Sequence, residues 1–188
     1  GQSSQGFEKK SYTIRLKNSD SSANPTSLLG MPSSNIWVLH ALHIDKALMR
    51  IPMSFHWSEQ MGNYATRRQY VEVFLNGDYR GLYMLCEKIT QGSGRVNIDS
   101  AGHILRIDWD DGGAGFNSEF NSMGGQSMTF QYEYPKSSQQ TQSQKEHIKE
   151  YVKDFEEALF SPDFVNSKGS RYSEYVDLES FADFLLIN

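Results

Sequence analysis

The segment Tyr70–Ile89 contains two largely apolar runs, residues 70–75 and 82–86, on either side of the pair Asn76-Gly77. Asn-Gly is the preferred centre of a type I′ turn, because both central residues need a positive φ and the twist of that turn matches its strands. The pattern therefore predicts two antiparallel strands. Because both faces are largely apolar, we expect the hairpin to be central in its sheet and covered on two sides. Its polar end begins at Glu87, where a ligand-binding edge is expected.

Alternation with a period of two predicts three more strands, at Ser11–Lys17, Gly102–Trp109 and Ser127–Tyr134. The apolar run Trp37–His43 is too short to be assigned to a helix or a strand by its pattern. The segment Asp110–Gly125 is rich in Gly, Asn, Ser and Asp, so it is predicted to be a loop with little core. Together with the hairpin, these strands predict a mainly antiparallel sheet.

A first helix is predicted to begin at Asp45, which can cap its N-terminus, and to run to about Met61. Pro52 lies inside this segment and should kink the helix or end its first part. The pair Gly62-Asn63 fits a C-terminal stop.

A second helix, Gln144–Phe160, is strongly amphipathic. Asp177 is predicted to cap a third helix, whose apolar residues continue almost to the last residue, Asn188. An apolar helix normally continues into a structure that buries it, so we expect a fragment that ends before its parent domain does. The apolar stripe of the second helix is expected to be core and comprises Ile148, Tyr151, Val152, Phe155, Ala158 and Leu159.

The chain has 188 residues, 38% of them hydrophobic and 13% aromatic, which is typical of one globular domain with a sizeable core. Its formal net charge of −5 argues against a nucleic-acid partner, because phosphate binding needs a basic face. No run of about 18 apolar residues occurs, so no membrane span is expected in this segment. The single cysteine, Cys86, cannot form an internal disulfide and is expected to be a small buried residue.

Common catalytic and metal-binding motifs are absent, because the sequence contains no CxxC, HExxH, GxSxG or Walker loop. His40 and His43 lie three residues apart, but no third ligand accompanies them, so a metal site is not the favoured interpretation. The acidic residues Asp108, Asp110 and Asp111 lack the glycine and the closing glutamate of an EF-hand calcium loop. A solvated acidic turn is therefore expected there.

The opening segment Gly1–Gly6 consists of small and polar residues and precedes a strand with Lys10 at its beginning. Exposed backbone N–H groups in such a loop can cradle a phosphate, and a lysine can neutralise it. A phosphate-type loop, a strand with an inward lysine, a helix, a two-stranded hairpin and a carboxylate follow one another. This is the element order of a protein-kinase N-lobe from its Gly-rich loop onward.

Five segments carry a resemblance to one family: GQSSQGFEKKSYTIRL, LLGMPSSNIWVLHALHIDKALMR, VEVFLNGDYRGLYMLCEKI, GHILRID and VDLESFADFLLIN. In this order they resemble the successive motifs of the CotH kinase family, the spore-coat protein H group of atypical kinases. The resemblance runs nearly from end to end. It implies a kinase-like fold, ATP with a divalent metal such as Mg²⁺ as cofactor, and phosphoryl transfer to serine of a protein substrate.

The resemblance also implies roles for residues near the N-terminus. Lys9 and Lys10 match the paired lysines of the family, one of which would contact phosphate. Lys10 is favoured because it is expected to share a strand face with Tyr12 and Ile14. The loop before them matches the Arg-Gly-x-Ser-Ser loop of the family without its arginine and comprises Gly1, Gln2, Ser3 and Ser4.

Two further motifs are matched later in the chain. Asp45 and Arg50 match the Asp-Lys-x-x-x-Arg helix motif of the family. The asparagine that usually follows is replaced here by an Ile-Pro pair, so the local helix geometry is expected to differ. The segment entering the hinge, where backbone groups would meet adenine, is matched by Leu85, Cys86 and Glu87.

One part of the family pattern is missing from this sequence. In the family, the catalytic and the metal-binding aspartates follow the helix that here reaches Asn188, so the chain contains neither. Phosphoryl transfer depends on positioning and on charge neutralisation by metal ions. We therefore expect the fragment to be inactive and to hold no tightly bound cofactor, while ATP and Mg²⁺ serve its full-length parent.

The sequence thus predicts an α+β fold, with a protein-kinase-like N-lobe of mainly antiparallel sheet and helices from the start of the C-lobe. The chain is expected to be a single partial kinase-like domain, N-lobe-like over residues 1–89 and beyond the hinge over residues 90–188. The leading hypothesis is a fragment of a bacterial CotH-like kinase that acts on a protein substrate. The alternative is a non-catalytic cell-surface, adhesion or scaffold module on the same fold. A secreted or cell-surface location is expected, because members of the family are often exported.

Overall fold

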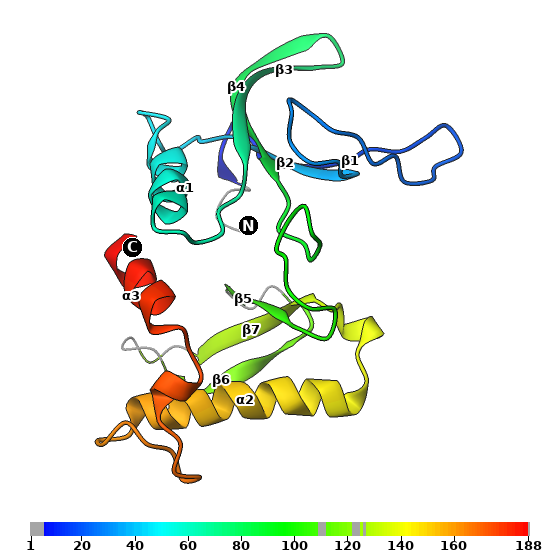
Figure 1. The fold of residues 1–188 in the computed structure, drawn as a ribbon. Helices are drawn as coiled ribbons and strands as arrows, with labels where there is room; N and C mark the ends of the chain where they lie inside the picture. Colours follow the sequence, from blue (N-terminus) through cyan, green and yellow to red (C-terminus); the bar gives the residue numbers. More distant parts are fainter. Residues whose placement is uncertain (1–5, 109–111, 122–124, 126, 188) are drawn as a thin grey trace. The chain divides into compact units, whose positions relative to one another are not determined.

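The computed structural model describes residues 6–108, 112–121, 125 and 127–187. The chain is divided into two compact units, one up to Asn97 and one from Ile98 to Leu186. Each unit contains an antiparallel sheet and at least one α-helix (Figure 1). The predicted α+β fold with mainly antiparallel sheets is therefore confirmed.

In the first unit, four strands form an antiparallel sheet in the order β1-β2-β4-β3 (Figure 1). The predicted hairpin is confirmed as β3 and β4, and its turn residues Asn76 and Gly77 have φ of 53° and 88°, as a type I′ turn requires. The unassigned apolar run after Ile36 supplies β2. The bounds are β1 (Tyr12–Arg15), β2 (Ile36–His40), β3 (Arg68–Leu75) and β4 (Asp78–Glu87).

The hairpin is central in this sheet through β4 alone, because β3 forms the edge. β2 pairs with β4 only from Met84 to Glu87, so the hairpin tip extends beyond the sheet. At this tip Phe74 is 65% exposed and lies 5.1 Å from the ring of Tyr79. The prediction that the hairpin is covered on two sides is therefore right near its base and wrong at its tip.

The core of the first unit lies on both faces of β2 and β4. One face buries Trp37, Leu39, Tyr83 and Leu85 together with Met31 and Ala41. The other face buries Met84, Cys86 and Leu42. Burial of a large apolar side chain stabilises the fold by about 1.5–3 kcal/mol. Cys86 is buried as expected, and desolvation, opposed by Arg68, raises the pKa of its thiol to about 11.

The first helix, α1 (Arg50–Gln60), begins later than predicted. Asp45 still contributes to its start, because its Oδ2 accepts a hydrogen bond of 2.6 Å from the backbone N–H of Arg50. Pro52 falls in the first turn, where its missing N–H removes no helical hydrogen bond, so the predicted break does not occur. The predicted stop is confirmed, since Gly62 follows the end of the helix with φ of 83°.

The second unit contains a three-stranded antiparallel sheet in the order β5-β7-β6, and a long helix packs beside β6 (Figure 1). The strands predicted at β5 and β7 and the three predicted helices are confirmed as strands and helices, with bounds that differ from the predicted ones. The bounds are β5 (Ile104–Asp108), β6 (Gly115–Asn121), β7 (Ser127–Tyr134), α2 (Gln142–Phe160) and α3 (Leu178–Ile187), with 3₁₀ turns at η2 (Ser137–Gln139) and η3 (Tyr172–Glu174).

β6 lies in the segment that the composition predicts to be a loop, so that prediction is wrong for residues 115–121. The glycine that suggested a loop serves close strand pairing instead. A Cβ on Gly115 would lie 2.2 Å from the carbonyl oxygen of Phe130 in β7. Phe116 then stacks on Phe130 with ring centroids 5.4 Å apart, which gives β6 an apolar anchor.

The two helices of the second unit begin at the caps that the sequence supplies. Thr141 forms a capping box with Gln144 at the start of α2. Asp177 accepts hydrogen bonds from the backbone N–H groups of Glu179 and Ser180, as predicted for α3. The predicted core stripe of α2 is buried at Val152 and Ala158. No helix of the described residues is long and apolar enough to cross a membrane.

Candidate functional site

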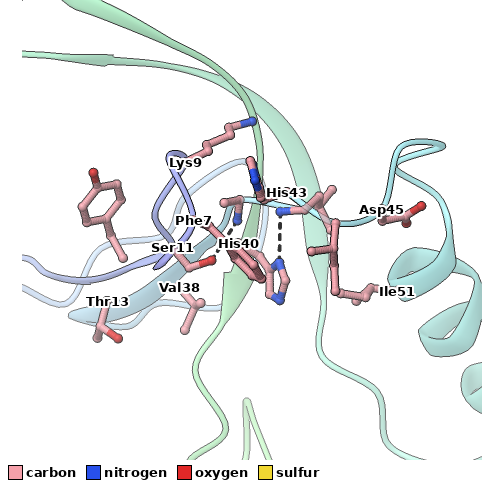
Figure 2. Close-up of a pocket in the computed structure, with 13 residues that line it drawn as sticks. Phe7, Lys9, Ser11, Thr13, Val38, His40, His43, Asp45 and Ile51 are labelled. Carbon is pink, nitrogen blue, oxygen red and sulfur yellow. Dashed lines mark hydrogen bonds between the residues drawn. The ribbon is translucent and has the colours of Figure 1, made fainter. Parts of the chain in front are cut away.

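A cavity of about 510 Å³ opens in the first unit beside β1 and the end of β2 (Figure 2). Binding sites for small molecules have volumes of about 300–1,000 Å³. The cavity has apolar walls and a set of polar groups from two segments of the chain, residues 9–13 and 40–45. The apolar residues include Phe7, Val38, Leu42, Ile44 and Ile51. The polar residues are Lys9, Ser11, Tyr12, Thr13, His40, His43 and Asp45.

Asp45 is the most constrained polar group of this cavity. The residue is 5% exposed, and its Oδ2 accepts the N–H of Arg50 at 2.6 Å. Its Oδ1 lies 4.0 Å from Nε of Arg50 and has no hydrogen-bond partner among the described residues. A buried carboxylate oxygen without a donor is costly, so this atom is a natural point of attachment for a ligand.

The backbone around Asp45 is held in an unusual conformation. Leu42 and Leu48 have φ of 52° and 57°, although residues with a Cβ rarely adopt positive φ. Backbone hydrogen bonds from Asp45 to Leu42 and from Leu48 to Asp45 close the two turns. Strain of this kind often occurs at ligand sites, where the surrounding structure fixes one side chain in place.

Lys9 supplies a positive charge to the cavity. Its ammonium donates to the carbonyl oxygen of Leu82 and lies 4.4 Å from the ring centroid of Tyr83. Burial lowers the pKa of Lys9 from its ordinary value. The side chain therefore lies against the sheet, and Figure 2 shows its ammonium beside the strand and not directed at the carboxylate of Asp45.

His40 lies at the end of β2 and completes the polar set. Its Nδ1 accepts the backbone N–H of Leu42 at 3.3 Å, which assigns the ring proton to Nε2 (Figure 2). Burial lowers the pKa of His40, so the neutral ring is favoured at pH 7. The ring of His43 is exposed and lies 4.9 Å from that of Phe7.

The structure brings together only some of the residues that the family resemblance singles out. Lys9 and Asp45 line the cavity, whereas Lys10 does not. β1 begins at Tyr12, so the strand alternation that favoured Lys10 does not extend to it. The side chain of Arg50 is 86% exposed. Arg50 supports Asp45 chiefly through its backbone N–H, which donates to Oδ2. Gly1, Gln2, Ser3 and Ser4 lie outside the described residues.

Leu85 and Cys86 do not line this cavity either. They lie between β2 and β3 in the sheet, and their backbone groups belong to its two ladders. The N–H of Glu87 donates to the carbonyl oxygen of Arg67. The backbone contacts with adenine that the resemblance implies for these residues stay a prediction.

Glu87 instead forms a buried ion cluster that the sequence pattern did not predict. Its side chain is 0% exposed and pairs with Arg67 at 2.8 Å and with Arg95. The guanidinium of Arg95 lies 4.9 Å from the ring centroid of Trp37. Arg67 also donates to the carbonyl oxygen of Gly94 at 2.8 Å. This cluster fixes the chain that follows β4 to the core of the first unit.

Two histidines and a serine of the cavity were not proposed as site residues from the sequence. His40 and His43 were considered only as a metal pair, and within the described part of the chain no group of three His, Cys, Asp or Glu residues is arranged to hold a metal. Ser11 accepts the N–H of Ala41 through its hydroxyl. The one available signal was the position of these residues at strand ends, where polar groups often gather at a site.

The four-stranded sheet with its helix is consistent with the N-lobe of a kinase-like protein. The chain was compared with models of protein families, with curated proteins and with solved structures. The family model described as CotH kinase protein matches residues 1–188, so the chain belongs to the CotH kinase family. No curated protein and no solved structure matches it.

Proposed function

We propose that the chain forms the nucleotide-binding part of a kinase that transfers a phosphoryl group from ATP to serine of a protein substrate. The observation that carries this proposal is the buried carboxylate of Asp45 in a cavity that Lys9 also lines. Its Oδ2 accepts a hydrogen bond, whereas its Oδ1 has no hydrogen-bond partner among the described residues. A ligand that brings a cation or a hydrogen-bond donor to Oδ1 would remove a free-energy cost. Membership of the CotH kinase family supports the same proposal.

The residues of the cavity fit ATP with Mg²⁺. Leu42, Ile44 and Ile51 form an apolar wall that suits a purine ring, and Lys9 suits the charge of the phosphates. Oδ1 of Asp45 can accept from a ribose hydroxyl or from a water molecule of Mg²⁺. When bound, ATP supplies the phosphoryl group and Mg²⁺ neutralises the charge of its oxygens.

The residues of this chain have three tasks in the proposed site. Lys9 binds a phosphate oxygen through its ammonium, which lies beside the ring of Tyr83. Asp45 orients the ligand, because the N–H of Arg50 fixes its carboxylate. His40 donates through Nε2–H while its Nδ1 stays engaged with Leu42. None of these tasks is a step of covalent chemistry.

We propose in addition that residues 1–188 alone bind the nucleotide weakly and do not turn it over. The motifs for a catalytic base and for metal-binding aspartates that the family resemblance implies are not among its matched segments. A bacterial origin and a secreted or cell-surface location belong to the same proposal and rest on the family resemblance alone.

The test is calorimetric titration of MgATP into the natural full-length protein and into residues 1–188. We expect Lys9→Met and Asp45→Asn to weaken binding about tenfold each, because each removes one charge-assisted contact. The matched control is Lys17→Met, an exposed lysine outside the cavity, which should bind as the wild type does. Lys10→Met shows which of the paired lysines contacts phosphate. We expect it to weaken MgATP binding less than Lys9→Met does.

Phosphoryl transfer to a serine-containing protein is assayed in parallel with γ-labelled ATP. We expect transfer by the full-length protein and none by residues 1–188. Equal affinity of the wild type and both cavity variants would contradict the assignment of the site. Absence of MgATP binding by the full-length protein would contradict the kinase proposal itself and favour a non-catalytic surface module.

A further inference from the structure

The edge strand β3 has backbone groups that no strand covers. Arg67 accepts the N–H of Glu87, so residues 67, 69 and 71 face β4 in the antiparallel ladder. The alternate residues Arg68, Tyr70 and Glu72 then direct their N–H and C=O groups away from β4. No other strand of the described residues pairs with β3. These groups form a row of unpaired donors and acceptors, with which another chain in an extended conformation can pair.

A second cavity of about 480 Å³ lies at the N-terminal end of this edge. It is lined by β3, by α1 and by a loop that precedes β2, and it does not include the residues of the proposed nucleotide site. The apolar part includes Leu29, Met31 and Pro52, and the polar part includes Arg67 and Gln69. A side chain of a strand added along β3 can therefore reach a pocket with a cationic wall.

The cavity is positively charged on a chain that is acidic as a whole. Arg68 is paired with Glu59 at 3.1 Å, so this pair is neutral. Arg67 and Arg95 share the single carboxylate of Glu87, which leaves one positive charge in excess. The side chain of Arg67 is 46% exposed, and its Nε and Nη2 have no partner in the described part of the chain. The net charge of the chain is −5, but residues 1–97 contain 11 Lys and Arg and 7 Asp and Glu, so the first unit has a net charge of +4 and this site shares its sign.

We propose that β3 binds an extended acidic segment of a partner protein as an added strand, with a carboxylate of that segment held by Arg67. Added strands gain affinity from main-chain hydrogen bonds and specificity from pockets for alternate side chains. The open backbone groups of Tyr70 and Glu72 can form the main-chain hydrogen bonds, and the cavity at Arg67 is the pocket for a side chain. A planar guanidinium that presents Nε and Nη2 side by side suits a carboxylate. The inference does not depend on kinase activity.

The experiment begins with selection of short random peptides displayed on phage against residues 1–188. Selected peptides are synthesised, and each is also made with its acidic residues replaced by the amides. We expect enrichment of Asp or Glu and about a tenfold loss of affinity for the amide forms, because a charge-assisted bidentate contact is lost. Arg67→Gln should produce the same loss for the acidic peptides and a small change for the amide forms.

Two variants at Glu72 test the main-chain contacts without touching the cavity. Glu72→Pro removes an N–H that faces the open edge, a position where proline is tolerated in an edge strand. Glu72→Ala is its control, because both variants lose the carboxylate and the acceptor for the Tyr79 hydroxyl, whereas only Glu72→Pro loses the N–H. We expect peptide binding to survive Glu72→Ala and to fall about tenfold in Glu72→Pro.

Hydrogen exchange of single amides shows where the peptide binds. The amides of Tyr70 and Glu72 should exchange fast in the free chain and slowly with peptide, whereas those of Gln69 and Val71 should be protected in both states. Selected peptides without acidic enrichment, or unchanged exchange at Tyr70 and Glu72, would overturn the proposal. Sedimentation shows whether the chain forms a dimer. A dimer that protects the amides of Tyr70 and Glu72 without peptide would also overturn the proposal, because a second copy of this chain would then occupy the edge of β3.

Discussion

The carboxylate of Glu87 lies between Arg67 and Arg95 in the interior of the first unit. Moving a charge from water into a protein interior costs several kcal/mol, which partner charges and hydrogen bonds offset. Arg95 also rests on the indole of Trp37 and donates to the carbonyl oxygen of Pro32 at 3.3 Å. A residue that the family resemblance places at an adenine contact is therefore a structural anchor in this chain.

Replacing Glu87 by glutamine tests this anchor. Glu87→Gln leaves Arg95 buried without its counter-charge, so we expect a loss of stability of about 3–5 kcal/mol. Urea unfolding of residues 1–188 measures the loss. Asp78→Asn is the control, because Asp78 and Arg80 form an exposed pair at 3.4 Å and such pairs contribute at most about 1 kcal/mol. Similar losses in the two variants would show that Glu87 does not act as a buried charge.

His40 gives the stability of the chain a dependence on pH. Burial lowers its pKa in the folded state, so below the ordinary value of about 6.5 the unfolded chain binds more protons than the folded one. The contribution of the neutral ring is therefore complete above that value and declines as the pH falls below it. Lys9, His43 and Asp45 line the same cavity.

His40→Asn isolates this contribution. Asparagine retains an acceptor for the N–H of Leu42 but does not titrate, so the decline in stability between pH 7 and pH 5 should be shallower in the variant. Urea unfolding at a series of pH values gives the two slopes. Above pH 7 the difference between the two proteins should be constant, which serves as the internal reference. Parallel curves over the whole range would contradict the assignment.

At the scale of elements, β6 shows how composition can conceal a strand. Asp and Gly dominate the sequence before it, and β6 itself contains Asn and Ser, but Gly115 is needed where the backbones of β6 and β7 approach closely. Phe116 and Phe130 then stack across the pair. A glycine inside a strand can thus indicate close approach as well as a turn.

Gly115→Ala tests that close approach. The new Cβ would lie 2.2 Å from the carbonyl oxygen of Phe130, so the backbone of β6 or β7 must move. We expect a loss of stability of about 1–3 kcal/mol, as for overpacked sites, with faster amide exchange in β6 and β7. Gly6→Ala is the control, because nothing lies within 4 Å of the position that its methyl group would take and its φ is not positive. Unchanged exchange in β7 would mean that the strand pairing tolerates a side chain here.

Across the whole molecule, local signals in the sequence predicted local structure well. The Asn76-Gly77 turn, the cap at Asp177 and the stop at Gly62 follow from backbone preferences of single residues, and all three are confirmed. The family resemblance predicted the family of the whole chain, which the family model over residues 1–188 confirms. Lys9 and Asp45 were among the residues that it singled out, and both line one cavity.

The errors arose where distant segments decide the outcome. β3 is an edge because β2, from an unassigned run, pairs with β4 on the other side. Glu87 lies inside because Arg95, from the loop that follows, supplies its counter-charge. His40 belongs to the candidate site because the turn after it returns to β1. Strand order and ion pairing of this kind depend on long-range contacts, which a pattern of neighbouring residues does not contain.

The position of Trp37 gives the molecule an optical reporter. The indole is fully buried and carries the guanidinium of Arg95 on its face, so it is shielded from water in the folded chain. Trp57 lies about half exposed on α1 and already meets water in the folded chain. Intrinsic fluorescence from Trp37 should therefore shift to longer wavelength when the core of the first unit opens. The fold thus supplies a label-free signal with which the opening of that core can be followed in time.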